Sequence, residues 1–295
     1  MDRVQWIAVG TIGVGVVVLA MKAAAWWLTG SSALYSDALE SVVNVVASLI
    51  AFGALRFAAR PADANHPYGH AKAEFFSAVI EGGLIIVAAL SILQHAWVTW
   101  QHPVTLDAPW LALSLTAAST AINGGWASLL GRVGRRERSA ALTADAKHLW
   151  SDVVTSVGIL AGLGVALGTG LAWVDPVVAA ATAVHVLWSG LGVVRSSVAG
   201  LMDEAPDEAT MERIRRAVHV HAAGAIEAHD LRTRHAGRYT YLEFHLVVPG
   251  AMRVDEAHEI CDRVEAALKA KVEGLVVTIH VEPEGKAKHQ GVLVL

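Results

Sequence analysis

Two segments, Ser36-Asp-Ala-Leu-Glu-Ser-Val-Val-Asn44 and Ala144-Asp-Ala-Lys-His-Leu-Trp-Ser-Asp152, place polar side chains inside stretches that are otherwise apolar. Each segment carries three polar residues at the spacing i, i+3, i+7, which predicts that the three share one face of a helix; they are Asp37, Glu40 and Asn44 in the first, and Asp145, His148 and Asp152 in the second. An ionisable side chain at the centre of a bilayer costs roughly 2.5–3.5 kcal/mol on insertion scales. The two triplets therefore need a compensating partner, and a divalent cation is the simplest one.

The composition of the chain is typical of a membrane protein. Of its 295 residues, 54% are hydrophobic and only 17% are charged, whereas about a quarter are charged in an ordinary soluble domain. The net charge of −4 argues against binding to nucleic acid. Because Cys261 is the only cysteine, we expect neither a disulfide framework nor a metal site built from thiolates.

Six apolar segments are long enough to cross a bilayer, which takes about 20 residues; they lie near 5–28, 33–57, 75–100, 109–131, 143–168 and 174–199. We interpret the first as a transmembrane helix and not as a cleaved signal peptide. Lysine and arginine occur in the connections on one side only, since the connections near 29–33, 101–108 and 169–174 contain none. The positive-inside rule then predicts that both termini lie in the cytoplasm. We expect a multi-pass protein in the lipid bilayer of the cell (inner) membrane.

Beyond Asp203 the sequence becomes charged and amphipathic. A helix after Pro206, two alternating stretches near 225–235 and 238–248, a helix near 253–272 and a strand near 276–282 give the order αββαβ. This order predicts a cytoplasmic α+β, ferredoxin-like domain after the six-helix transmembrane bundle. The expected domains are thus a transmembrane part at 1–203, a metal-binding part at 204–284 and a tail at 285–295.

A metal site between the second and fifth segments is the first functional hypothesis. If these helices touch, four side chains offer nitrogen and oxygen ligands, which suits zinc; they are Glu40, Asn44, His148 and Asp152. Asp37 and Asp145 lie one turn away and would support the ligands or substitute for them. The alternative is a buried polar network that only joins helices.

Two further clusters lie outside the apolar segments. The loop Asp63-Ala-Asn-His-Pro-Tyr-Gly-His70 offers a carboxylate and two imidazoles, from Asp63, His66 and His70; the alternative is a polar loop with incidental histidines. The C-terminal domain offers His229, His245, His258, His280 and Glu282. His280 and Glu282 share one strand face, but scattered histidines are often ordinary surface residues.

At these residues the chain resembles the cation diffusion facilitator family, particularly its bacterial zinc/iron-efflux branch, over nearly its whole length. The resemblance is carried by Ala25-Trp-Trp-Leu-Thr-Gly-Ser31, Pro61–Glu74, His148-Leu-Trp-Ser-Asp152, His229–Arg234 and Thr278–Pro283. It implies a homodimer that exports divalent cations, with Zn²⁺ favoured, in exchange for protons by alternating access. It also implies that all three clusters bind metal, the first as the transport site and the others as cytoplasmic sites. Lys72 and Asp203 are similar to a pair that ties the membrane and soluble parts together across the dimer.

One departure from the family pattern concerns the second segment. Where the family usually has Asp/Asp or His/Asp, this chain has Glu40 and Asn44. An amide is a weaker ligand than a carboxylate and has no proton to release, so Mn²⁺ and Fe²⁺ remain candidate substrates with Co²⁺, Ni²⁺ and Cd²⁺.

Two other functions stay open on sequence grounds. A membrane-bound metal sensor or scaffold that does not transport would need only the cytoplasmic sites. A membrane-embedded metalloenzyme would need an open coordination position and a general base. We find no His-Glu-x-x-His segment in the sequence, and we expect no enzymatic activity.

Overall fold

The computed structural model describes residues 3–102, 109–136, 140–236, 239–288 and 292–293, without the side chains of residues 3–9, 55, 134–136, 140–145, 147–148 and 292–293. The chain divides into two compact units. Unit 1 comprises residues 1–53 and 77–194, and unit 2 comprises residues 54–76 and 195–295. The segment that precedes the third apolar stretch therefore clusters with the C-terminal domain.

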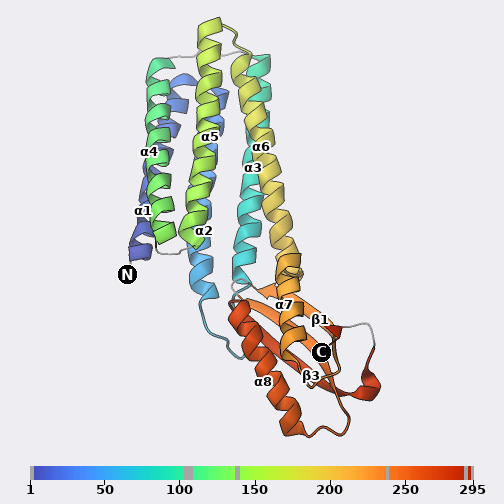
Figure 1. The fold of residues 1–295 in the computed structure, drawn as a ribbon. Helices are drawn as coiled ribbons and strands as arrows, with labels where there is room; N and C mark the ends of the chain where they lie inside the picture. The colour runs from blue at the N-terminus through green and yellow to red at the C-terminus, as the bar shows by residue number, and fades with distance from the viewer. Residues whose placement is uncertain (1–2, 103–108, 137–139, 237–238, 289–291, 294–295) are drawn as a thin grey trace. The chain divides into compact units, whose positions relative to one another are not determined.

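The six apolar segments form six long helices, as the sequence predicts (Figure 1). They are α1 (Arg3–Thr29), α2 (Ser32–Ala58), α3 (Ala73–Gln101), α4 (Pro109–Arg136), α5 (Ala140–Thr169) and α6 (Val174–Leu201). Within the described residues, five of them (α1, α2, α3, α5 and α6) are long and apolar enough to cross a membrane. The remaining helix, α4, has the same length but carries many Gly, Ser, Thr and Asn residues.

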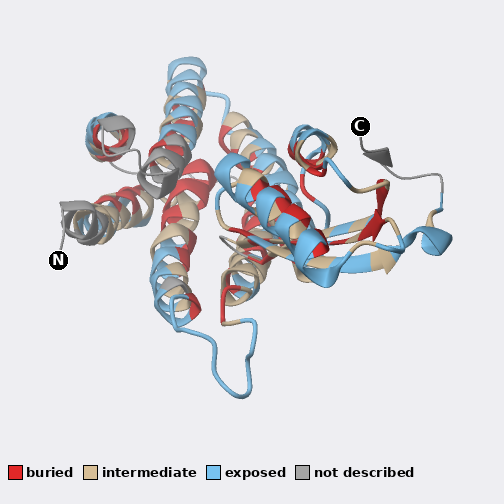
Figure 2. Cartoon of the chain, turned by 60° about the horizontal axis from the view of Figure 1, so that its bottom comes forward, coloured by how far each residue is buried: buried red, intermediate tan, exposed pale blue. Residues whose placement is uncertain are grey.

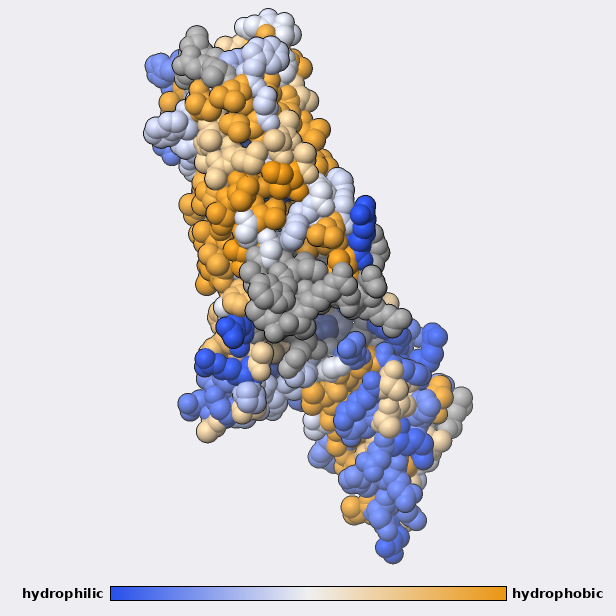
Figure 3. All heavy atoms as spheres, turned by 90° about the vertical axis from the view of Figure 1, so that its left-hand side faces the viewer, coloured by the Kyte–Doolittle hydropathy of each residue, from blue (hydrophilic) through white to orange (hydrophobic). Residues whose placement is uncertain are grey.

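Apolar side chains are exposed along the helices of unit 1. Exposed (pale blue) positions run along the long helices in Figure 2. Val154, Val184 and Leu191 are among the exposed apolar residues. In Figure 3, apolar residues (orange) gather over the helices of unit 1 and hydrophilic residues (blue) over the C-terminal domain. Large exposed apolar areas are rare on soluble proteins, so these helix faces are suited to contact lipid.

Small residues let two of the helices approach closely. A Cβ atom at Gly82 of α3 would lie 3.1 Å from the backbone oxygen of Gly190 in α6, and one at Gly190 would lie 2.7 Å from Ile85. Membrane helices pack by such close contacts because lipid gives no hydrophobic drive for their association.

A buried ion pair connects α1, α2 and α5. The Lys22 ammonium of α1 donates to Oδ1 of Asp37 in α2 at 2.7 Å and to the Ser156 hydroxyl of α5 at 3.1 Å. The Ser156 hydroxyl donates to the same Asp37 oxygen at 2.7 Å. Lys22 is 2% exposed and Asp37 is 1% exposed, so each charge depends on the other for its compensation.

A second buried carboxylate holds the start of α2. Asp175, at the beginning of α6, accepts hydrogen bonds from the backbone N–H of Ser32 at 2.7 Å and of Ala33 at 3.3 Å. It also accepts the hydroxyl of Ser31. The first N–H groups of a helix have no partner within the helix, and Asp175 supplies one from a neighbouring helix.

The C-terminal domain of unit 2 has the predicted order αββαβ and an additional short strand. It contains α7 (Glu208–His221), β1 (Glu227–Ala236), β2 (Tyr239–Val248), α8 (Val254–Lys271), β3 (Leu275–Pro283), a 3₁₀ turn (Glu284–Lys286) and β4 (Val292–Leu293). The strand order is β3-β2-β1-β4, with β1 antiparallel to β2 and β2 parallel to β3. The strand β4 pairs with β1 and lies in the tail at 285–295, where no strand was predicted.

The core of this domain lies between the sheet and the helices α7 and α8. It includes Ile214 of α7, Phe244 and Leu246 of β2, and Val264 and Leu268 of α8. Alternate residues of β2 point to this core, so His245 and Glu243 fall on the opposite face. The sheet thereby presents its histidines away from the helices.

We predict that replacing Lys22 by Met will lower the unfolding free energy by about 3–5 kcal/mol, because it leaves Asp37 buried without its counter-charge. The double variant Lys22→Met/Asp37→Leu should recover most of that loss, since it removes both charges. Denaturant unfolding in detergent micelles measures both effects. Equal stability of the single and double variants would contradict this account of the ion pair.

Candidate metal sites

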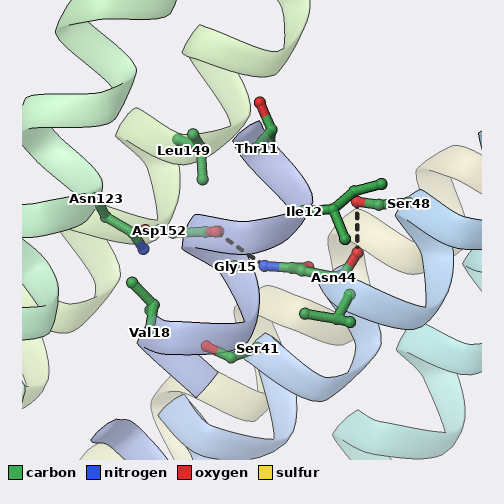
Figure 4. Close-up of a pocket in the computed structure, with 11 residues that line it drawn as sticks. Thr11, Ile12, Gly15, Val18, Ser41, Asn44, Ser48, Asn123, Leu149 and Asp152 are labelled. Atoms are coloured by element: carbon green, nitrogen blue, oxygen red, sulfur yellow. Dashed lines mark hydrogen bonds between the residues drawn. The ribbon is translucent and has the colours of Figure 1, made fainter. Parts of the chain in front are cut away.

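A small cavity lies between α1, α2, α4 and α5 (Figure 4). Its volume is about 80 Å³, and its polar lining includes Asn44, Asn123 and Asp152. The side-chain amide of Asn44 donates to Oδ2 of Asp152 at 2.8 Å, which joins α2 to α5. Asp152 is 4% exposed. The structure thus brings together one predicted ligand from each of the two helices.

The other predicted residues of this site have different surroundings. Glu40 lies one turn before Asn44 on α2, is half-buried, and is within electrostatic reach of Asp152 and Asp37. Asp37 contacts Lys22 and Ser156, while its Oδ2 is buried without a hydrogen-bond partner. His148 and Asp145 belong to α5, but their side chains lie outside the described residues.

Sequence reasoning missed some polar groups at and beside this cavity. Asn123 of α4 is 4% exposed and lines it, while Lys22 and Ser156 are buried beside Asp37. The signal that could have found Asn123 and Lys22 is the same one that found the triplets, namely a polar side chain within an apolar segment. Neither residue has a second ionisable or amide side chain at helical spacing on its own helix, so the triplet pattern does not include them.

The loop between α2 and α3 brings its three predicted ligands together. Ligand atoms of Asp63, His66 and His70 lie within 4.8 Å of one another. Nε2 of His70 is 3.2 Å from Oδ2 of Asp63 and 3.1 Å from Nδ1 of His66. His70 is buried and its Nδ1 has no hydrogen-bond partner. An aspartate and two imidazoles at such distances fit a divalent cation.

Local backbone hydrogen bonds hold the Asp63 carboxylate in its ionised form. Oδ1 of Asp63 accepts the backbone N–H of His66 at 2.7 Å and of Asn65 at 2.9 Å. The hydrogen bond from His66 lowers the pKa of Asp63 below its usual value. The loop therefore presents an anionic ligand at neutral pH.

Aromatic and ionic contacts within unit 2 tie this loop to the sheet. The Arg234 guanidinium lies 4.9 Å from the ring centre of Tyr68 in the loop and 4.4 Å from that of Tyr241 in β2. Lys72 and Asp203, the pair that resembles a contact across the dimer, lie 2.8 Å apart within one chain. A cavity of about 510 Å³ remains between residues 58–71 and the strands β2 and β3.

The sheet of the C-terminal domain aligns three of its predicted histidines. His229 of β1 pairs with His245 of β2, and His245 pairs with His280 of β3, so the three stand side by side across the strands. The Glu282 carboxylate lies 3.3 Å from Nε2 of His229 and 3.4 Å from Nδ1 of His245. Both of these nitrogens are buried without a hydrogen-bond partner. Unpartnered nitrogens beside a carboxylate are suited to binding a metal ion.

Asp230 joins this cluster through an irregularity of β1. The register with β2 shifts between His229 and Arg232, and Asp230 has a positive φ of 53°. The bulge lets the Asp230 carboxylate lie within 4.8 Å of ligand atoms of His229 and His245, although neighbouring residues of a regular strand face opposite sides. A hydrogen bond from the Lys288 ammonium lowers the pKa of Asp230.

His258 differs from the other predicted ligands. It lies on α8, is exposed, and its Nδ1 is 3.3 Å from Oδ2 of Asp262 on the same helix. Among the described residues, it is outside the groups whose ligand atoms approach one another. Cys261 beside it is half-buried, and burial raises the pKa of its thiol, which opposes a thiolate ligand.

Solved structures similar to this chain cover less than a third of it. The chain is 48% identical to the structure titled "Mode of Action of a Putative Zinc Transporter CzrB (Zn form)", which covers 29% of this chain and 98% of that one with a TM-score of 0.27. It is 26% identical to the metal-bound C-terminal domain of the CzcD transporter from Thermotoga maritima, over 27% of this chain and 93% of that one, with a TM-score of 0.26.

Curated relatives match nearly the whole chain. An uncharacterized transporter of Synechocystis, sll1263, is 40% identical over 94% of this chain and 89% of its own length. The cation-efflux pump FieF of Pectobacterium atrosepticum is 33% identical over 94% of this chain and 91% of its own length. FieF of Escherichia coli is 30% identical over 96% of this chain and 94% of its own length.

Two family models cover most of the sequence. The cation efflux transmembrane domain matches residues 10–202, and the cytoplasmic domain of cation efflux proteins matches residues 206–284. With its apolar helices, the chain is a multi-pass membrane protein. It belongs to the cation diffusion facilitator family of cation efflux transporters, which are not enzymes.

Proposed function

We propose that this transporter exports divalent metal cations from the cytoplasm in exchange for protons, with Zn²⁺ as the favoured substrate. The observation that carries the proposal is the Asn44–Asp152 contact, which joins α2 and α5 at a polar cavity between apolar helices. A carboxylate, an amide and the neighbouring Glu40 are oxygen donors, and His148 would add a nitrogen. The protein would lie in the cell inner membrane with both termini in the cytoplasm.

Competition between metal and protons would drive the exchange. Metal binds the deprotonated ligands, so protons from the outside displace it when the site opens outward. We assign the proton switch to His148, because imidazole is the side chain that titrates near neutral pH. Asp37 and Asp145 would support the ligands, and Lys22 would keep the Asp37 charge compensated through the cycle.

The proposal assigns separate roles to the transmembrane domain and the cytoplasmic domain, whose bounds differ from those of the two compact units. Residues 1–203 would carry the transport site, residues 204–284 the cytoplasmic metal sites, and residues 285–295 a tail. Divalent ions would be held by Asp63, His66 and His70 in the loop, and by His229, His245, His280 and Glu282 in the sheet. His258 would complete the cytoplasmic set. Bound metal supplies a positive charge that stabilises these anionic and imidazole clusters and the homodimer.

Replacing Asp152 by Asn should reduce Zn²⁺ uptake into proteoliposomes to the level of empty liposomes, because the site loses a buried anionic ligand without a change in side-chain size. The matched control is Ser151→Ala, since Ser151 is exposed on the adjacent position of α5 and should retain transport. Full activity of Asp152→Asn would refute the site. Absence of flux in the unmodified protein would favour a metal sensor.

Replacing Asn44 by Asp should change the order in which Zn²⁺, Fe²⁺, Mn²⁺, Co²⁺, Ni²⁺ and Cd²⁺ are transported, in favour of Zn²⁺. The amide now donates to Asp152, whereas a second carboxylate would face Asp152 as another anionic ligand. The measurement is competitive transport, with Ser48→Ala in the wall of the same cavity as the control. An unchanged order would exclude Asn44 as a selectivity ligand.

Replacing His70 by Ala should lower the amount of zinc bound per chain at equilibrium, because the loop loses its buried ligand. Equilibrium dialysis followed by metal analysis measures the loss. His102→Ala is the control, since His102 is exposed at the end of α3. The same zinc content in the His70 variant and in the control would show that the loop holds no ion.

A further inference from the structure

A buried carboxylate that is not among the predicted ligands lies beside His229 in the sheet. Glu227, the first residue of β1, is 0% exposed. Ionised side chains are almost never buried to this degree in a soluble domain unless they are paired. The buried carboxylate of Glu227 therefore needs partners that donate hydrogen bonds to it or compensate its charge.

One such partner is His229. The two residues are separated by two positions in β1 and face the same side of the strand. Oε1 of Glu227 lies 2.8 Å from Nδ1 of His229. Because a carboxylate accepts hydrogen bonds and does not donate them, Nδ1 must carry the proton in this contact.

The proton on Nδ1 determines what His229 offers to its other side. In the neutral imidazole, the lone pair is then on Nε2, which points toward the Glu282 carboxylate at 3.3 Å. Nε2 is buried and has no hydrogen-bond partner. Nε2 of His229 and the Glu282 carboxylate are then both hydrogen-bond acceptors, and neither can donate to the other. A cation bound between them would stabilise both.

A backbone contact from the tail fixes the carboxylate from another direction. The backbone N–H of Lys288 donates to the same Oε1 of Glu227 at 2.8 Å. The Lys288 ammonium pairs with Asp230 at 2.6 Å, beside His229. Glu227 is thus held in place by main-chain geometry and not only by the histidine that it orients.

We propose that Glu227 is a positioning residue of the cytoplasmic metal cluster. It sets the affinity of the cluster for a divalent cation by holding His229 with Nε2 directed at Glu282. Glu227 does not bind the metal itself, because its carboxylate contacts the opposite nitrogen of the ring. Carboxylates in this relation to a metal-binding histidine typically change affinity 10–100-fold when removed. The inference rests on the proposed binding of metal at this cluster.

The chain contains a matched control for this residue. Glu243 of β2 precedes His245 by two positions, as Glu227 precedes His229, but it is exposed. A carboxylate that acts only through its charge near the cluster would have the same effect at either position. One that acts by orienting a buried imidazole would have an effect only at Glu227.

Zinc affinity of the full-length protein in detergent micelles tests the proposal. The parent carries Asp152→Asn and His70→Ala, which silence the transport site and the loop, and Zn²⁺ is titrated against a fluorescent chelator. We expect Glu227→Ala to weaken binding about 10–100-fold, Glu227→Gln to weaken it less because its amide oxygen still accepts from Nδ1, and Glu243→Ala to leave it unchanged.

Nitrogen-15 NMR of histidine-labelled protein without metal separates positioning from a general effect on folding. His229 should carry its proton on Nδ1 in the parent and in Glu227→Gln, and should shift toward the Nε2 form in Glu227→Ala. Equal zinc affinity of Glu227→Ala and Glu243→Ala, with His245→Ala abolishing binding, would overturn this inference alone. Zinc binding that is the same in the parent and in His245→Ala would overturn the cluster and this inference together.

Discussion

Charged side chains buried between apolar helices need partners, and the arrangement of α1, α2 and α5 follows from that need. Lys22 compensates Asp37, and Ser156 completes the contact from the third helix. Asn44 and Asp152 meet close by, along the same two helices α2 and α5. A carboxylate that is compensated by a lysine, as Asp37 is by Lys22, can remain buried between apolar helices.

The loop cluster and the sheet cluster, which lie outside the apolar helices, share a different feature. In both the loop and the sheet, a buried imidazole nitrogen has no hydrogen-bond partner, at Nδ1 of His70 and at Nε2 of His229. Buried polar atoms without partners are rare in proteins. Nε2 of His229 lies 3.3 Å from the Glu282 carboxylate, whereas in His70 it is the other ring nitrogen, Nε2, that lies 3.2 Å from Asp63. At Nε2 of His229 a divalent cation would supply the missing partner. The same pattern distinguishes them from His258, which is exposed and pairs with Asp262 on its own helix.

The pattern of the sequence predicted the architecture well and the contacts unevenly. The lengths of the apolar segments predicted the six long helices, and the spacing of apolar and polar residues predicted the αββαβ order. Both patterns follow from how a helix or a strand buries its apolar side chains. The strand β4 was missed, since two residues that pair at a sheet edge leave no periodic signal. Asp37 was grouped with the metal ligands because its spacing fits, but spacing does not reveal that Lys22 of another helix lies 2.7 Å from it. Glu227 gave no signal at all, because an isolated glutamate at a strand start is ordinary until its burial is known.

The sequence by itself determined the membrane-spanning class, the order of the elements and the residue types that can bind metal, because these depend on composition and on spacing along one helix or strand. Only the tertiary structure decided which of those residues meet. The register of three strands aligns His229, His245 and His280, and a bulge adds Asp230 to them. Packing of separate helices decides that Asp152 contacts Asn44 while Asp37 contacts lysine. Buried charges are compensated by partners that are distant in sequence, as Lys22 is from Asp37. The separation of two residues along the chain does not tell whether they meet in the folded protein.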